Sequence, residues 1–144
     1  MSPRIRRLLE ERRLVRTRIS RNRVIKEMDG ARYDLERAQK SLSDGDFKWA
    51  TVQAYYAMFH AARALVYSQG YREKSHYCLA VALGALFVDD GAMEAQSVRD
   101  FLNAMNLREA ADYEAEFSQS GAKAVIASAE KFIEKATAIL GISG

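Results

Sequence analysis

The stretch Ala54-Tyr-Tyr-Ala-Met-Phe-His-Ala-Ala-Arg-Ala-Leu65 decides how this chain folds. It contains neither Gly nor Pro, and alanine, its commonest residue, has the highest helix propensity. The stretch is apolar around almost its whole circumference, which is typical of a helix inside a bundle. Buried polar side chains need hydrogen-bond partners. The stretch therefore predicts a central helix whose polar side chains form a structural network or a site: Tyr55, Tyr56, His60 and Arg63.

Helical periodicity continues on both sides of this stretch. Apolar residues recur every three or four positions over residues 24–43, and the turn at residues 43–46 separates that helix from the central one, residues 47–68. Further helices are expected after Ser75, from about residue 94 to 105, and over residues 122–140. No segment alternates with a period of two. The sequence predicts an all-α fold, an up-and-down bundle of four to five helices.

Charge divides the chain into two parts. Residues 1–26 contain ten Arg or Lys and two acidic residues, whereas residues 27–144 contain twelve and seventeen. We expect residues 1–26 to be a basic N-terminal extension, helical over residues 4–26, and residues 27–144 to be the bundle domain. The extension either binds phosphates or an acidic partner, or it is a solvated helical extension, or it is sequence upstream of the true start.

Composition and spacing argue against a metal site, a cofactor site and a membrane span, and they favour one cellular compartment. The chain has one cysteine and two histidines, and it lacks a glycine-rich phosphate loop, zinc-ligand spacing and a nucleophile elbow. We therefore predict no metal and no cofactor. No apolar stretch approaches the roughly 20 residues that span a bilayer. The lone Cys78 is interpreted as a buried side chain, and it favours a reducing compartment, so we predict a cytoplasmic protein.

Three polar groups are candidates for a site. Tyr56, His60 and Arg63 are spaced by four and three, so they share one helix face, either as a site or as a structural network. His76 lies near a helix N-terminus, which disfavours the imidazolium and suits phosphate binding. Arg108 and a carboxylate four positions later can pair on one helical turn, and the simplest interpretation is an intrahelical salt bridge.

The order of these segments resembles the HEPN domain, the higher-eukaryote and prokaryote nucleotide-binding family, in its stand-alone prokaryotic UPF0332-like branch. The resemblance rests on five segments: ARYDLERA (31–38), AYYAMFHAARAL (54–65), REKSH (72–76), LREAADY (107–113) and AEKFI (129–133). It implies a helical bundle that dimerises. Many HEPN proteins are metal-independent endoribonucleases of toxin–antitoxin and defence systems, with an Arg followed four to six positions later by a His. Here Arg108 is followed by Asp112 and Tyr113 instead.

We therefore predict a dimeric HEPN-type binding or interaction module, not primarily an enzyme, that binds a nucleotide or RNA or acts with a nucleotidyltransferase partner. The expected ligand-binding residues are Tyr56, His60, Arg63, Arg108, Asp112 and Tyr113. The resemblance also implies that such a transferase could modify the Tyr113 hydroxyl. One alternative is a ribonuclease with a rearranged site, in which Arg108 holds the phosphate and His60 or His76 is the base. The other is a structural protein that docks through its basic arm.

Overall fold

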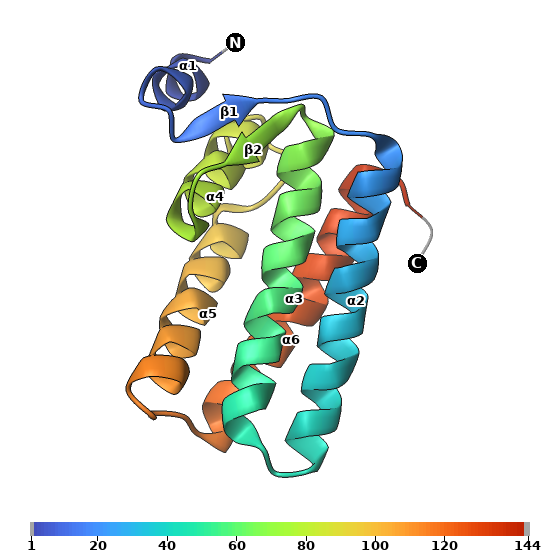
Figure 1. The fold of residues 1–144 in the computed structure, drawn as a ribbon, viewed down its shortest axis with the longest axis vertical. Coiled ribbons are helices and arrows are strands. Elements are labelled where there is room, and N and C mark those ends of the chain that lie inside the picture. The colour runs from blue at the N-terminus through green and yellow to red at the C-terminus, as the bar shows by residue number, and fades with distance from the viewer. Residues whose placement is uncertain (1, 143–144) are drawn as a thin grey trace.

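The computed structural model describes residues 2–142, and its long helices run alongside one another (Figure 1). These are α2 (Arg21–Ser43), α3 (Phe47–Ser68), α5 (Ala95–Tyr113) and α6 (Gln119–Leu140). The shorter elements are α1 (Pro3–Glu10), β1 (Leu14–Arg16), β2 (Tyr71–Glu73), α4 (His76–Leu83) and the π-helical turn η1 (Gly84–Val88). The predicted all-α bundle is confirmed. None of the helices in residues 2–142 is both long enough and apolar enough to cross a membrane.

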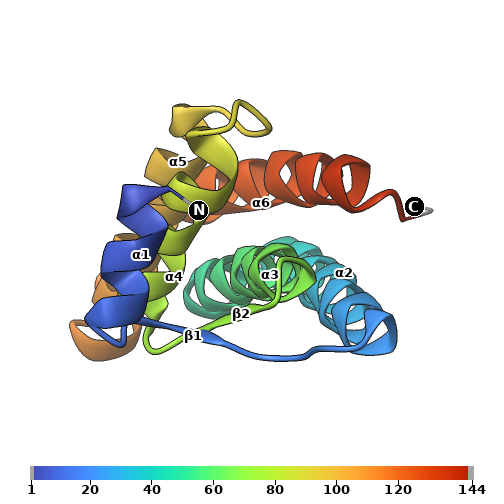
Figure 2. The same cartoon turned by 90° about the horizontal axis from the view of Figure 1, so that it is seen from above.

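The stretch quoted above lies in the middle of α3, at the centre of the bundle. This helix contacts α2, α4, α5, α6 and β2. Seen from above, it lies between α2 and α4, with α6 on a third side (Figure 2). Tyr55, Met58 and Leu65 are completely buried along it. Alanines at the crossings allow the neighbouring helices to approach closely, so α3 positions side chains from every other long helix.

Side-chain caps set the helix starts that the sequence indicated. Asp46 accepts a hydrogen bond from the Trp49 amide at the start of α3, and Ser75 accepts one from the Cys78 amide at the start of α4. The end of α5 differs from the expectation, because the helix continues past Asn106 to Tyr113. Polar side chains cover the exposed side of this extra length, while its apolar side remains in the core.

The basic N-terminal segment is not the single helix expected over residues 4–26. After α1 the chain turns at Arg12, whose φ is 57°, and forms β1, which pairs antiparallel with β2 in the register Leu14↔Glu73, Val15↔Arg72 and Arg16↔Tyr71. Leu8 and Leu14 are buried, with 4% and 1% of their surface exposed. Burial of these apolar side chains favours packing on the bundle over a solvated helix.

Two further features tie this segment to the rest of the chain. Arg4 Nη1 lies 3.1 Å from Asp89 Oδ1, just after η1. The boundary drawn between residues 26 and 27 falls inside α2, which begins at Arg21. That residues 27–144 form a domain separate from the extension stays a prediction. The sequence did not predict β1 and β2, because three residues are too few to show an alternating pattern.

Candidate functional site

Arg108 lies on the inner side of α5 and is 8% exposed. Its guanidinium carbon lies 5.1 Å from the ring centroid of Tyr55 and 5.6 Å from that of Tyr56, so the cation rests on two aromatic faces of α3. Its Nη1 is 3.7 Å from Asp112 Oδ2, one turn further along α5. The buried Nε has no hydrogen-bond partner within residues 2–142. Arg108 therefore keeps a donor that is not satisfied by the protein.

His76 meets the same tyrosine from the first turn of α4. Its Nδ1 lies 2.6 Å from the Tyr55 hydroxyl, and its ring is stacked 4.3 Å from the ring of Phe59. Burial lowers the pKa of His76, and the positive charges of Arg108 and Arg63 lower it further. The imidazole is therefore neutral at neutral pH. The lowered pKa has the direction predicted for this position, but its causes are burial and the two arginines, and not the helix N-terminus.

The hydrogen bond between Tyr55 and His76 fixes which nitrogen carries the proton. Burial raises the pKa of Tyr55 above its usual value, and the charge of Arg108 and a side-chain hydrogen bond with it oppose the shift without cancelling it. The phenol is thus protonated, and we assign its hydroxyl as the donor to Nδ1, because short distances are typical of an O–H donor. That assignment leaves the imidazole proton on Nε2. His76 then offers a second N–H donor in the group of side chains around Tyr55, which also includes Arg108.

A second polar cluster lies one to two turns further along α3 and is centred on Glu27 of α2. Its Oε2 is 2.7 Å from His60 Nδ1, and its Oε1 is 3.2 Å from Arg23 Nη2 and 3.8 Å from Arg63 Nη1. Burial alone raises the pKa of Glu27, but the hydrogen bond from His60 and the charge of Arg63 lower it below its usual value overall. Glu27 is therefore an ionised carboxylate that is only 5% exposed.

Two more carboxylates complete this cluster. Arg63 Nε forms an ion pair with Glu73 Oε2 of β2 at 3.1 Å, and His60 Nε2 lies 3.5 Å from Asp34 Oδ2. Burial raises the pKa of both acids, partly offset by Arg63 for Glu73 and by His60 for Asp34. Carboxylates therefore face both ring nitrogens of His60. The cluster joins α2, α3 and β2 and is organised as a structural network.

A sequence profile described as the HEPN domain matches residues 26–139. This chain belongs to the HEPN family. The HEPN chain is 32% identical over 90 residues to a Methanocaldococcus jannaschii protein named "Putative toxin MJ0605", covering 62% of this chain and 67% of that protein. It is 28% identical over 116 residues to the Gloeobacter violaceus "UPF0332 protein glr0978", covering 78% and 92%.

A solved structure shares the HEPN fold seen here. It is the crystal structure of TT1696 from Thermus thermophilus, which superposes with a TM-score of 0.70 and covers 81% of this chain and 98% of that one. The sequence identity is 21%, so this likeness concerns the fold alone. The region matched by the family profile includes α3, α4, α5 and most of α2 and α6, whereas α1 and β1 lie outside it.

The structure brings some of the predicted site residues together and separates others. Tyr56, Arg108 and Asp112 lie in one group with His76, while His60 and Arg63 belong to the Glu27 cluster. The ring of Phe59 lies between the two groups, 4.3 Å from the His76 ring and 5.2 Å from the guanidinium carbon of Arg63. Tyr113 is 78% exposed at the end of α5. His76 is therefore the histidine that accompanies Arg108 in this HEPN domain.

Sequence reasoning did not single out Phe59, Glu27 or Glu73. Phe59 occupies the helix face between Tyr56 and Arg63, so helical spacing could have indicated it. Glu27 follows Arg23 by four positions and precedes Met28, a fully buried residue, which is a weak signal for a buried ion pair. Glu73 lies in the REKSH segment, but nothing in the sequence indicated that its side chain is buried, because this burial depends on pairing between β1 and β2.

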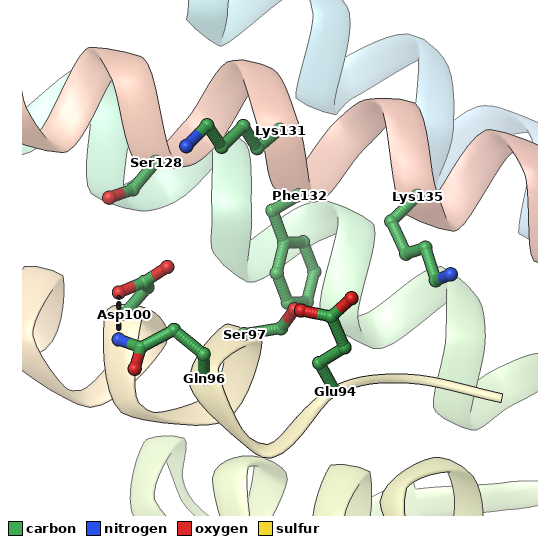
Figure 3. A pocket seen from close by; sticks show the side chains of 8 residues that line it. All are labelled: Glu94, Gln96, Ser97, Asp100, Ser128, Lys131, Phe132 and Lys135. Atoms are coloured by element: carbon green, nitrogen blue, oxygen red, sulfur yellow. Dashed lines mark hydrogen bonds between the residues drawn. The ribbon is translucent and has the colours of Figure 1, made fainter. Parts of the chain in front are cut away.

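A hollow between α5 and α6 lies apart from both clusters (Figure 3). Its volume is about 220 Å³, and it is lined by Glu94, Gln96, Ser97, Asp100, Ser128, Lys131, Phe132 and Lys135. None of the predicted site residues lines it. Residues 2–142 also contain no group of three or more His, Cys, Asp or Glu side chains arranged to hold a metal ion. The candidate site is consequently the surface at which α3, α4 and α5 meet.

Proposed function

We propose that this HEPN domain is a binding module of a toxin–antitoxin or defence-type system and that it holds a phosphate group of RNA or of a nucleotide against Arg108 and His76. One observation carries the proposal: Arg108 is 8% exposed, yet its Nε has no partner within the described residues. A buried donor without a partner costs free energy. A bound phosphate oxygen would satisfy it after a small rotation of the guanidinium, because Nε is buried in the unbound chain.

The chemistry of the neighbours supports an anionic ligand. Arginine binds phosphate through its planar fork of N–H groups, and the rings of Tyr55 and Tyr56 keep this fork in place. Neutral His76 adds an Nε2–H donor without adding a full charge. Asp112, at 3.7 Å, is too distant to saturate the guanidinium. The site thus offers more donors than its own acceptors can use.

The direct test compares Arg108→Ala with Arg99→Ala. Both arginines are on α5, but Arg99 is exposed and, among residues 2–142, its side chain bonds only to Gln96. Losing hydrogen bonds to a charged group costs about 1.5–3 kcal/mol, so Arg108→Ala should weaken the binding of AMP or a short RNA about 10- to 100-fold by isothermal calorimetry. Arg108→Lys keeps the positive charge but loses the planar fork of N–H groups. If this variant is folded and still binds weakly, the loss of affinity comes from lost recognition and not from lost folding. Equal affinity for all three variants contradicts the proposal.

A second candidate function, metal-independent RNA cleavage, is favoured by the neutral His76 beside Arg108. In that reaction the ribose 2′-hydroxyl attacks phosphorus, the P–O5′ bond breaks, and a 2′,3′-cyclic phosphate and a 5′-hydroxyl remain. Arg108 would stabilise the charge on the phosphate. Neutral His76, in its other tautomer with the proton on Nδ1, would take the 2′-hydroxyl proton on Nε2 and then return it to the departing 5′-oxygen. His76→Asn should abolish the cyclic product while preserving RNA binding. Retained cleavage by this variant removes the second candidate.

Partner proteins form the last part of the proposal. We infer that the chain forms a homodimer and also acts with a nucleotidyltransferase, for which the exposed hydroxyl of Tyr113 would be the acceptor. Tyr77, 54% exposed at the other end of the site, is a matched control. Intact-mass spectrometry after incubation with the transferase and ATP should show nucleotidyl groups on wild type and Tyr77→Phe but not on Tyr113→Phe. Light scattering should give twice the mass of one chain.

A further inference from the structure

The ribbon made by β1 and β2 has one face on the bundle and one face toward solvent (Figures 1 and 2). Side chains alternate across a strand. Leu14 and Glu73, which are paired in the register, point inward: Leu14 is buried, and the side chain of Glu73 is 7% exposed. Val15 and Arg72 form the next pair, on the opposite face, and Arg13 and Lys74 continue that outer face on either strand. These four outer positions therefore carry three cations and no acid.

A hollow of about 500 Å³ opens beside this face. It is lined by Leu9, Arg12, Leu14, Val15, Arg16 and Lys74. Half of these side chains are cationic, the other half are aliphatic, and none is acidic. The cations come from both the N-terminal arm and the segment after β2. The hollow therefore exists only because the arm folds back onto the bundle, and it is not a property of the arm alone.

Tyrosines accompany the arginines at both ends of the ribbon. The guanidinium carbon of Arg13 lies 5.9 Å from the ring centroid of Tyr77, which is 54% exposed, and that of Arg16 lies 5.8 Å from the ring of Tyr71. An acidic partner, Glu11, lies 3.6 Å from Arg13 across a solvent-exposed ion pair. An exposed aromatic ring beside cations is the arrangement that binds a single nucleic-acid strand, by base stacking and phosphate contacts.

We infer that this basic ribbon surface binds the backbone of single-stranded RNA. The surface comprises the outer-face cations Arg13, Arg72 and Lys74, the cations Arg12 and Arg16 that line the hollow, and Tyr77. Charge complementarity supports the choice, because the surface and its hollow concentrate positive charge while residues 27–144 as a whole are acidic. The surface is also adjacent to the phosphate site along the chain, since Lys74 is only two residues before His76. The inference rests on the proposed function and extends it by giving RNA a path to Arg108, but it can fail separately.

The test compares the RNA affinity of two variants. One lacks three cations of the hollow, and the other lacks three cations on a different face of the molecule. The ribbon variant is Arg12→Gln/Arg16→Gln/Lys74→Gln, and the matched control is Lys123→Gln/Lys131→Gln/Lys135→Gln, all on the exposed side of α6. A fluorescein-labelled oligouridylate of about 12 nucleotides is titrated with each protein at several salt concentrations. Far-UV circular dichroism and thermal midpoints verify that both variants are folded.

The ribbon variant should bind the oligonucleotide at least about tenfold more weakly, whereas the control should remain within about twofold of wild type. Each lost phosphate contact reduces the slope of log affinity against log salt by about 0.7, so the slope should fall by about 2. AMP should still bind the ribbon variant, whereas Arg108→Ala should lose AMP and keep most of the salt slope. Together these two variants show separately whether the inference about the ribbon surface fails and whether the proposed phosphate site fails.

Two results overturn the inference. In the first, the ribbon and control variants lose the same affinity and the same slope, which means that the surface makes no particular contact. In the second, wild type binds labelled polyglutamate more tightly than the oligonucleotide, and only the ribbon variant loses that binding. The surface would then belong to an acidic polypeptide instead of RNA.

Discussion

The substitution Glu27→Gln tests whether the buried carboxylate holds α2 and α3 together. It removes the negative charge that accepts the 2.7 Å hydrogen bond from His60 and the 3.2 Å bond from Arg23. A hydrogen bond to a charged group contributes about 1.5–3 kcal/mol, and the i,i+4 pair with half-exposed Arg23 adds about 0.5 kcal/mol. Because the glutamine oxygen still accepts one bond, we expect a loss of about 2–3 kcal/mol in the free energy of unfolding.

The pH dependence gives this prediction a second, independent readout. The pKa of Glu27 is lowered in the folded state, so its contribution is present above the unfolded pKa and is lost as pH falls through the folded one. A protonated Glu27 resembles glutamine. The difference between wild type and Glu27→Gln should therefore be smaller below about pH 4.5 than near neutral pH.

Urea unfolding followed by circular dichroism at 222 nm measures both effects. Glu36→Gln, on the exposed side of the same helix, is the matched control and should change the unfolding free energy by less than about 0.5 kcal/mol. The reasoning is refuted if Glu27→Gln is as stable as the control at neutral pH. It is also refuted if the difference from wild type is the same near pH 7 and near pH 3.

Three further substitutions test other parts of the structure. Tyr55→Phe leaves His76 Nδ1 without its donor and should cost about 1–2 kcal/mol; the pKa of His76, followed by NMR, should rise because the neutral form loses its hydrogen bond. Leu14→Ala empties a site that is 1% exposed and should cost about 2–5 kcal/mol in urea unfolding, whereas a loose N-terminal arm would give almost no change. Gly70→Ala places a Cβ at a φ of 83° and should lower stability by about 1 kcal/mol in thermal denaturation; an unchanged midpoint would show that the turn before β2 relaxes freely.

The helices could be predicted because their signals are local. Asp46 and Ser75 cap helices in ways that depend on residues three positions away, and the apolar repeat in α6 is visible without any tertiary information. Arg108 and Asp112 pair within one turn, as their spacing indicated. Such features follow from helix geometry alone.

The rest depends on contacts between distant segments. His76 was identified as a candidate, but its meeting with Tyr55 and Arg108 required the path of β2 into α4. His60 shares a helix face with Tyr56, as predicted, but its side chain hydrogen-bonds to Glu27 of α2 and does not join the group around Arg108. Residues 14–16 form a strand because β2 offers them backbone hydrogen bonds. Tertiary contacts of this kind override local propensity and leave no local signal.

The pairing of Val15 with Arg72 also has a consequence for the order in which parts of the chain fold during synthesis. During translation β1 leaves the ribosome before β2, because α2 and α3 lie between them in the sequence. β1 therefore cannot pair with β2 until both helices have been synthesised. Contacts with such large sequence separation form slowly and late. Arg12 and Lys74 therefore come to share one hollow only in a finished molecule, so a nascent or truncated polypeptide would lack this composite surface.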